Sequence, residues 1–590
     1  AIPYSVETVE KNAFANTNLH SVTVKNPETT LEKESIPNTT EKLIGFQGSS
    51  VASYCQNANR ESYEILTTIP DDFFKDEVTM ESFDIPANIT SVGNNAFDSC
   101  VNLKDITLGR VQTIGSYAFN NTKIAELEIP NTVQSIGERA FSSIAALETI
   151  EFEDQSVLSN IGAFAFAKAN VTEVSIPESV VLVGKGAFNG CFALNEATFE
   201  GMNANLTYDE ISAVFPNSTV VKCYYKSKAY DFAMAHEYPI SLMVGYEKDK
   251  TEEYSYVQDS PAHLVEVTVG PLLKKINAGA FKGCKNLTTI SFDEEAILAE
   301  IGESAFANSG LAAIELPKTV ITLGEGAFEE AESLVSVSFG GVTNVPNNAF
   351  NGCSSLTTLK DTDQFETIGE NAFAGTALTE FTTGDSLISF GENAFADSTL
   401  NVLGVENPNC KFPAGPLVPN GTEIKGYTNS TADIYSQTYL NKSCTSYGKP
   451  AYVVQLNTMG GINGDEKVYV VNGKPIPPIV IPEKEDYSFV GYFSSENGGV
   501  QYFDENGKST KTWDGTMNLT LYASWKHDQY TVAYNGNGAT EGIMKADAFD
   551  TKTNVNLTKN AFGKKGYQFL GWSTDRNATK AMYTDKDTVK

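Results

Sequence analysis

The segment IGSYAFNNTKIAELEIPNTVQS, residues 114–135, contains every feature of a unit that recurs along much of this 590-residue chain. A second copy, IGESAFANSGLAAIELPKTVIT, occupies residues 301–322. The central Ala-Phe dipeptide recurs at steps of 22, 22, 25 and 22 residues in one run, and of 25, 22, 22, 23 and 22 in another. A fixed interval of this length indicates one coil of a stacked repeat protein. The phenylalanines of the two runs are Phe97, Phe119, Phe141, Phe166 and Phe188, and then Phe281, Phe306, Phe328, Phe350, Phe373 and Phe395.

The parts of the unit have separate physical roles. In the pattern L-x-x-I-x-I the last two apolar residues alternate with period two, which predicts one short strand per coil of 22–25 residues. The Pro that follows blocks further ladder pairing. The Ile-Gly pair predicts a turn, because Gly accepts positive φ. A single coil cannot bury its Ala and Phe side chains, so we expect the coils to stack around a core formed by the eleven phenylalanines.

Four of the eight cysteines, Cys100, Cys191, Cys284 and Cys353, stand three residues after a repeat Phe. Other coils place Ala, Ser or Thr in this slot, which indicates a tight inward position. A buried free thiol is therefore favoured over a metal ligand or a nucleophile. Outside the slot, a disulfide between Cys410 and Cys444 stays open as a less favoured alternative.

The repeated unit resembles the BspA-type leucine-rich repeat, which occurs in surface proteins of oral and gut bacteria and of some mucosal protozoa. The resemblance covers roughly two thirds of the chain and rests on many copies of the unit. It implies an α/β repeat solenoid, a right-handed superhelix with a strand-lined face. It also implies a surface role in attachment to host molecules or to other cells.

Three segments interrupt the repeat and resemble one another. They begin at Leu43, Val220 and Glu423, and each combines a short apolar strand, an aromatic residue, a Ser followed shortly by Ala, and a Tyr within an expected helix. A solenoid needs atypical end coils to cover its last apolar layer, so we interpret these segments as caps. The predicted blocks, each ending in a cap, are residues 1–66, 67–245 and 246–447. Residues 246–260, at the start of the third block, are a linker or a strand pair.

From Ala451 the sequence changes to alternating β-type runs separated by Gly and Asn turns. Two related modules, predicted over 448–527 and 528–590, resemble the Listeria-Bacteroides repeat. This small β-grasp-like module also follows the leucine-rich repeats of internalin-type proteins. The first copy has Tyr492 where the second has the more typical Trp572.

The second module ends before a strand that would match NLTLYASW, residues 518–525, so we expect the natural protein to continue. We interpret the modules as a spacer. A glycan- or protein-binding role for Tyr522, Trp525 and Trp572 is the alternative, although aromatics at repeat positions more often fill a small core.

Composition and motifs argue against several function classes. Forty-two Lys and Arg against seventy-four Asp and Glu give a net charge of −32, which phosphate backbones and anionic lipids repel. No apolar stretch approaches the ~20 residues of a membrane span. The four histidines are far apart, and no nucleophile elbow, zinc motif or phosphate loop occurs. We therefore predict no enzyme activity, no catalytic residue, no metal, no cofactor, no nucleic-acid partner and no membrane insertion in this segment.

The best binding signal lies on the strand face opposite the core, at the x positions of L-x-x-I-x-I. In the second block these positions are acidic, mixed with Thr and Ser, whereas in the third block they are mostly Ser and Thr. We hypothesise that the acidic stripe binds a basic protein segment or cations. Solubility and protection of strand edges form an alternative of at least equal weight. The acidic residues are Asp105, Glu126, Glu128, Glu151, Glu173 and Glu196.

Together these features predict an extracellular, adhesin-like protein of a bacterial cell surface, attached through a region outside this chain. Its ligand would be a protein or glycan on a host or neighbouring cell. A structural stalk without a specific ligand is one alternative. The binding region of a larger enzyme, whose catalytic domain lies elsewhere, is the other.

Overall fold

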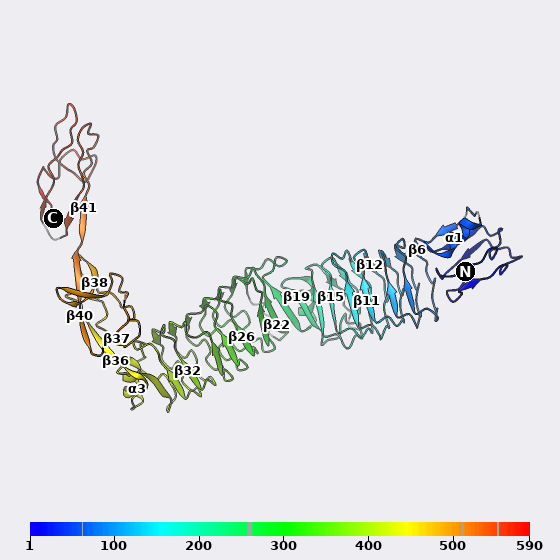
Figure 1. Cartoon of the computed structure of the whole chain (residues 1–590), viewed down its shortest axis with the longest axis horizontal. Coiled ribbons are helices and arrows are strands. Elements are labelled where there is room, and N and C mark those ends of the chain that lie inside the picture. Colours follow the sequence, from blue (N-terminus) through cyan, green and yellow to red (C-terminus); the bar gives the residue numbers. More distant parts are fainter. Residues whose placement is uncertain are drawn as a thin grey trace. The chain divides into compact units, whose positions relative to one another are not determined.

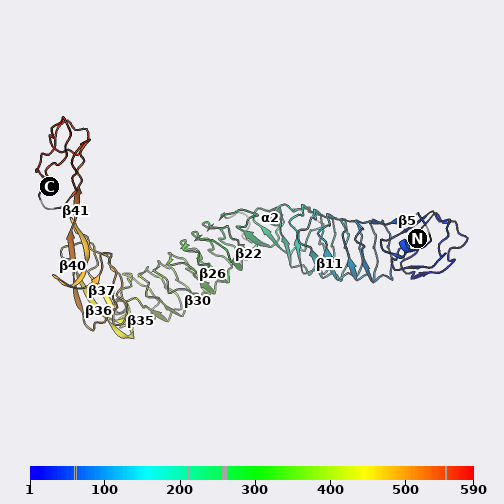
Figure 2. The same ribbon diagram turned by 45° about the horizontal axis from the view of Figure 1, so that its top comes forward.

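The computed structural model describes residues 1–58, 60–61, 63–209, 211–255, 262–509, 511–551 and 554–589. The chain forms two compact units, Ala1–Leu378 with Asn393–Thr399, and Thr379–Glu392 with Leu400–Lys590. The first unit consists of stacked coils, whose strands lie side by side in both views of the ribbon (Figures 1 and 2). The predicted repeat solenoid is thus confirmed, as are the β-rich modules behind it.

The L-x-x-I-x-I segments form the predicted strands, and equivalent residues of successive coils pair in parallel. Leu127 of one coil lies opposite Ile150 of the next. This register places the apolar residues of every coil on the core side. The strands of this face in the first unit are β2 Ser21–Thr23, β4 Lys42–Gly45, β5 Tyr63–Ile65, β7 Ser82–Asp84, β9 Asp105–Thr107, β11 Glu126–Ile129, β13 Thr149–Phe152, β15 Glu173–Ile176, β17 Glu196–Phe199, β19 Val220–Tyr224, β20 Ile240–Val244, β22 Leu264–Val269, β24 Thr289–Phe292, β26 Ala313–Glu315, β28 Ser336–Ser338 and β30 Thr358–Lys360.

Outside the segments that contain α1 and α2, each coil of the first unit also contributes a second, two-residue strand that the sequence pattern did not indicate. The Ile of the Ile-Gly pair belongs to this strand, and Ile114 pairs with Ile136 of the next coil. Seven such strands form one continuous parallel sheet. The short strands of the first unit are β1 Thr8–Val9, β3 Thr30–Leu31, β6 Thr68–Ile69, β8 Ser91–Val92, β10 Thr113–Ile114, β12 Ser135–Ile136, β14 Asn160–Ile161, β16 Leu182–Val183, β18 Asn205–Leu206, β21 Glu253–Tyr254, β23 Lys275–Ile276, β25 Glu300–Ile301, β27 Thr322–Leu323, β29 Asn344–Val345 and β31 Thr367–Ile368.

The repeat Gly serves a different purpose from the one predicted. Among the described residues, the left-handed position is not this Gly but the residue two places later, such as Tyr117 with φ 57°. The Gly is required because the coils touch at this point. A Cβ on Gly137 would lie 2.5 Å from the carbonyl carbon of Gly115 in the preceding coil, closer than real Cβ contacts come. The prediction of a positive φ at this Gly was therefore wrong, and close backbone approach explains the residue instead.

The repeat phenylalanines form two columns of parallel rings inside the first unit. Phe119 and Phe141 stack with centroids 5.1 Å apart, and Phe328 and Phe350 with centroids 5.2 Å apart. The backbone ties the column together, since the amide of Phe119 donates to the carbonyl of Ala140 at 2.7 Å. All eleven rings of the two predicted runs are buried.

The cysteine slot is a buried inward position, as predicted. Cys100, Cys191, Cys284 and Cys353 are buried free thiols. The Sγ of Cys353 donates to the carbonyl of Phe328 at 3.0 Å, which ties adjacent coils together. Cys410 and Cys444 are also free, so the disulfide alternative is not realised in the described residues.

A short helix occupies each of the three segments interpreted as caps. The helices are α1 Ser50–Asn57, α2 Lys228–Ala235 and α3 Thr431–Tyr439. Each follows an N-cap Ser, and in α2 the Oγ of Ser227 accepts a hydrogen bond from the amide of Tyr230. Each helix buries one tyrosine, Tyr54, Tyr230 or Tyr435, so the helix covers apolar side chains at these positions. Of the predicted linker or strand pair at 246–260, residues 246–255 include the short strand β21, and the remainder lies outside the described residues.

The second unit contains α3, the last coil strands and both C-terminal modules. Its main sheet runs β32-β34-β35-β36-β40-β38-β39, and β37 also pairs with β36. The long strand β36 pairs with β35 at its start and with β37 and β40 further along, so the predicted boundary at 447/448 lies inside a strand. The strands are β32 Glu380–Thr382, β33 Ser389–Phe390, β34 Val402–Gly404, β35 Glu423–Thr428, β36 Thr445–Asn457, β37 Lys467–Val471, β38 Tyr487–Ser495, β39 Gly498–Phe503, β40 Leu519–His527, β41 Gln529–Val532, β42 Asp547–Asp550, β43 Val555–Asn556 and β44 Thr588–Val589.

Candidate binding surface

The strand face of the second block holds the six acidic residues singled out from the sequence. Glu126 and Glu128 lie on β11 with exposed side chains, because their neighbours Leu127 and Ile129 point into the core. Glu128 pairs directly with Glu151 of β13. Neighbouring strands lie about 4.8 Å apart, so two carboxylates stand side by side here. Neither has a hydrogen-bond or ion-pair partner among the described residues.

The remaining predicted acids do not extend this pair into a continuous stripe. Glu126 lies opposite Thr149 of the following strand, so a hydroxyl residue interrupts the row of acids there. Asp105 lies opposite Ser82 of the preceding strand. A second pair, Glu173 and Glu196, occurs on β15 and β17. The second pair is partly neutralised, because Lys222 approaches Glu196 at 3.7 Å and Thr198 donates to it at 3.0 Å.

A groove of about 600 Å³ opens beside this face, beyond the ends of β13 and β15. Of its acidic lining, only Glu151 was predicted from the sequence. The sequence pattern did not identify four further carboxylates of the groove, because they follow the strands and do not lie on them. An acidic residue shortly after the strand in each of these coils was the signal in the sequence that could have identified them. They are Glu153, Asp154, Glu178 and Glu200.

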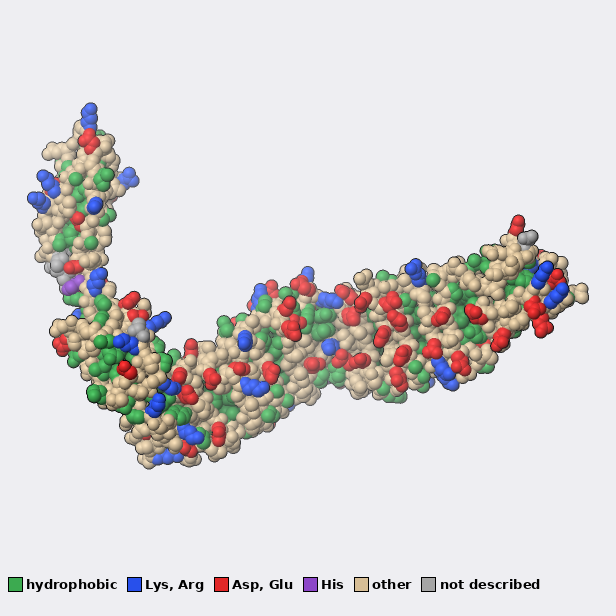
Figure 3. Space-filling view, viewed as in Figure 1, with side chains coloured by type: hydrophobic (Ala, Val, Ile, Leu, Met, Phe, Trp, Pro, Cys, Tyr) green, Lys and Arg blue, Asp and Glu red, His purple; other side chains and the backbone are tan. Residues whose placement is uncertain are grey.

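Three groove carboxylates are already engaged by neighbouring groups, and one of them is Glu200, which accepts a hydrogen bond from the Ser175 hydroxyl at 2.8 Å. Lys248 forms an ion pair with Glu178 at 2.9 Å, and the amide of Asn131 donates to Glu153 at 2.9 Å. The space-filling view shows Asp and Glu side chains gathered over the region of β11 and β15 (Figure 3). Ionised carboxylates only accept hydrogen bonds, so this surface suits cationic donors such as guanidinium and ammonium groups.

The third block presents a different strand face. Ser336 and Ser338 lie on β28, and Thr358 and Lys360 on β30. The Lys360 ammonium forms an ion pair with Glu315 at 3.5 Å, so a cation on the same face neutralises the negative charge of Glu315. The acidic character of the strand face is therefore a property of the second block.

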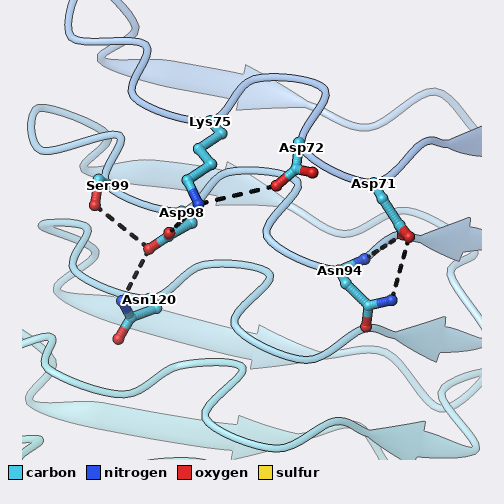
Figure 4. A network of polar contacts seen from close by, with 7 residues as sticks. All are labelled: Asp71, Asp72, Lys75, Asn94, Asp98, Ser99 and Asn120. Atoms are coloured by element: carbon cyan, nitrogen blue, oxygen red, sulfur yellow. Dashed lines mark hydrogen bonds and ion pairs between the residues drawn. The ribbon is translucent and has the colours of Figure 1, made fainter.

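The turn edge of the second block carries a separate polar network (Figure 4). The carboxylate of Asp71 accepts from the backbone amide of Asn94 at 2.6 Å. Lys75 lies 3.3 Å from Asp98, which also accepts from the side chain of Asn120 at 2.8 Å. Because each bond joins one coil to the next, this network supports coil stacking.

The tail aromatics considered as ligand contacts lie partly inside their modules. The Nε1 of Trp525 donates to the carbonyl of Thr458 at 2.9 Å, and its ring meets Phe489 with centroids 5.5 Å apart. Trp525 thus helps to close the first module, and Tyr522 precedes it on β40. In the second module, the Trp572 ring packs 4.8 Å from the Tyr534 ring, beside a groove of about 1040 Å³.

Within the described ranges, no group of three or more His, Cys, Asp or Glu side chains is arranged to hold a metal ion. A search of the same ranges finds no helix whose length and hydropathy would let it span a bilayer.

Known proteins resemble the chain in parts. A protein of Evansella cellulosilytica, provisionally named a membrane protein, is 31% identical over 147 residues, which is 24% of this chain and 20% of that protein. The chain therefore matches about a fifth of the length of this relative. A solved leucine-rich repeat protein from Bacteroides ovatus covers 62% of the chain and 91% of its own length, at 20% identity and a TM-score of 0.26. A leucine-rich cell surface protein from Faecalibacterium prausnitzii covers 50% of the chain and 83% of its own length, at 21% identity and a TM-score of 0.22.

Two family signatures account for most of the sequence. The Listeria-Bacteroides repeat domain matches residues 452–524 and 530–590. The BspA type leucine-rich repeat region matches residues 1–62, 67–211 and 266–401, in six copies that span more than half of the chain. The chain therefore belongs to the BspA-type leucine-rich repeat family.

Proposed function

We propose that this chain is an adhesin-like binding protein of the cell surface, whose acidic strand face takes a basic segment of a partner protein. The observation that carries the proposal is the pairing of Glu128 with Glu151, two exposed carboxylates in register on adjacent strands, neither of which has an ion-pair partner among the described residues. The groove beside them extends the acidic surface.

Electrostatics favours such a partner. Two like charges about 4–5 Å apart repel by roughly 1 kcal/mol at the dielectric constant of water, and a bound cation reverses the sign of this energy. Arg offers a planar fork that matches a carboxylate with two hydrogen bonds, and Lys offers a point charge. The protein's net charge of −32 also attracts cationic partners over longer distances.

The same proposal includes a location at the cell surface. Repeat solenoids present extended faces to partners, and the relative from Evansella cellulosilytica is named as a membrane protein. We propose that the chain is displayed outside the cell, with the C-terminal modules as spacer. The proposal is one of binding, without a catalytic step.

The test is a fluorescence anisotropy titration of the intact chain with a labelled octa-arginine peptide at low and high salt. Replacing Glu126, Glu128 and Glu151 together by Gln should weaken binding about fivefold or more at low salt, because the lost charges lie at the contact. The effect should shrink at high salt, where screening shortens the range of the field.

A matched control separates local from global electrostatics. Replacing Glu294, Glu295 and Glu332 by Gln removes the same charge from exposed positions of the third block. This control should change the affinity less than twofold. Equal losses in both triple variants would show that net charge alone attracts the peptide, and the acidic face would lose its assigned role.

A further inference from the structure

A left-handed residue occurs directly before the repeat Ala in coil after coil, two places after the repeat Gly where that Gly is present. Small or amide side chains tolerate this conformation best, since a bulky side chain crowds the backbone at positive φ. The third block follows this rule without exception in the described coils. Its residues at this slot, with φ between 51° and 66°, are Gly279, Ser304, Gly326, Asn348, Asn371 and Asn393.

The second block departs from the rule at three successive coils. Tyr117, Arg139 and Phe164 occupy the slot with φ of 57°, 54° and 56°. The flanking coils return to Asn95 and Gly186. Three bulky residues in a disfavoured backbone conformation, side by side and nowhere else in this slot among the described coils of the two blocks, form an outlier of the kind that marks functional sites.

The three side chains form a ladder along the turn edge. The Arg139 guanidinium lies 4.4 Å from the centroid of the Phe164 ring and 5.9 Å from that of Tyr117. The Phe164 ring in turn covers Gly186, where a Cβ would lie 2.5 Å from its Cε1. All three side chains are half-buried, so their outer edges remain accessible.

The guanidinium N–H groups of Arg139 lack hydrogen-bond acceptors among the described residues. Its only ion pair among the described residues joins Nε to Glu138 at 3.7 Å, which is beyond hydrogen-bond distance. Nε is buried and has no hydrogen-bond partner, and no acceptor for the terminal nitrogens occurs among the described residues. The aromatic rings hold the guanidinium in place, while its N–H donors make no hydrogen bond to the described residues. The guanidinium is therefore positioned to bind an anion.

We propose that Tyr117, Arg139 and Phe164 bind a carboxylated sugar unit of a glycan. The guanidinium would pair with the sugar carboxylate through two hydrogen bonds, and the flanking aromatic edges would contact the apolar side of the sugar ring. A single carboxylate on an otherwise neutral glycan fits better than a polyanion, because a net charge of −32 repels ligands with many negative charges. This site lies on the turn edge, whereas the acidic face lies on the strands, so the two proposals stand or fall separately.

If the three residues form a binding site, substitutions there should remove ligand binding without lowering the stability of the protein. Replacing Tyr117 and Phe164 together by Asn, the residue used at Asn348 and Asn371, should relieve the backbone and leave the unfolding midpoint unchanged or raised. The same change should abolish ligand binding, because the ring contacts are lost. A purely structural ladder would behave in the opposite way, with a lower midpoint.

The test is saturation-transfer NMR on the intact chain with methyl glucuronide and methyl glucoside, two probes that differ only at the C6 carboxylate. Methyl glucuronide should bind about tenfold more tightly or better, since a hydrogen bond to a charged group contributes about that factor. Arg139→Gln should remove this preference. Arg139→Lys should lose most of the binding because it lacks the fork, and Glu138→Gln should strengthen it by removing a negative charge beside the bound carboxylate.

Controls make the outcome decisive. Ser304→Asn alters the same slot in the third block and should change neither binding nor stability. Equal binding of the two sugars, or unchanged binding by Arg139→Gln, would overturn the site. Equally tight binding of N-acetylglutamate would show a site for peptide carboxylates and would overturn the sugar assignment.

Discussion

At the scale of single residues, the stability of the fold depends on the column of phenylalanine rings and on a Gly at the point where successive coils touch. Phe141 stacks between Phe119 and Phe166 at 5.1 and 5.5 Å and is fully buried. Removing its ring leaves a cavity that the neighbouring coils, fixed by their own hydrogen bonds, cannot collapse to fill. Phe141→Ala should therefore lower the free energy of unfolding by about 3–5 kcal/mol, measured by urea titration. Val181→Ala, at a side chain that is 53% exposed, serves as the control and should cost far less.

The repeat Gly offers a second residue-scale prediction. A Cβ on Gly137 would meet two backbone atoms of the preceding coil at 2.5 Å, so Gly137→Ala must push the coils apart. Overpacking of this kind costs about 1–3 kcal/mol or more, which thermal unfolding would reveal. Gly415→Ala is the matched control, because the nearest atom to its Cβ would be Glu392 Cδ at 3.6 Å. Equal stability of the two variants would contradict the close approach of the coils.

The thiols in the inward slot make the stability depend on pH. Burial raises the pKa of Cys284 and of Cys353 to about 12. A thiol whose pKa is raised on folding stabilises the protein below the pKa of the unfolded chain, and this contribution is lost as pH rises from about 8.5 toward the folded value. We expect the unfolding midpoint to fall above pH 9, with a shallower fall in Cys353→Ala. Reaction of the native chain with a thiol reagent at pH 8 should be slow, and rapid labelling of these two residues would contradict their burial.

At this scale, the sequence predicted which side chains face the core, but it did not predict the backbone conformation. The period of the phenylalanines follows directly from stacking, so the sequence predicted the columns. The repeat Gly could be explained by a positive φ or by close approach of two coils, and the sequence alone does not distinguish these two explanations. For the same reason the left-handed slot of Tyr117, Arg139 and Phe164 could not be found, since the residues themselves are not typical of that conformation.

At the scale of secondary-structure elements, one alternating pattern predicted the long strands and placed the acids on their outer face. It did not reveal the short strands, because two residues before a Gly carry no periodicity. Neither did it reveal the groove, whose carboxylates come from segments after the strands. Pairing between coils decides which acids meet, and here Glu128 meets Glu151 whereas Glu126 meets Thr149.

Within the second unit, a polar cluster holds the first module to the coil segments that precede it. Lys474, just after β37, forms ion pairs with Asp385 at 2.8 Å and Glu406 at 3.6 Å and lies over the Tyr427 ring. Lys474→Ala should destabilise this junction by about 1 kcal/mol, because a half-buried charge network loses its only cation in the described cluster. Hydrogen exchange should accelerate in β36 and β37. Lys508→Ala, at an exposed Lys without an ion pair in the described chain, should leave exchange unchanged.

At the scale of the whole chain, the sequence revealed the class of architecture because repetition multiplies a weak local signal. The boundary between the repeats and the C-terminal modules was harder to predict from the sequence. A single strand, β36, pairs with cap strand β35 and with module strands β37 and β40. A boundary drawn from a change in composition therefore falls inside an element.

The central claim is that the recurring phenylalanines stack into columns inside a coiled solenoid. Crystallographic diffraction from the chain tests it most directly. We expect parallel rings from Phe97 to Phe188 with neighbouring centroids 4.9–5.5 Å apart, all shielded from solvent. An electron-density map with these rings in solvent, or with consecutive Ala-Phe units in separate compact domains, would contradict it.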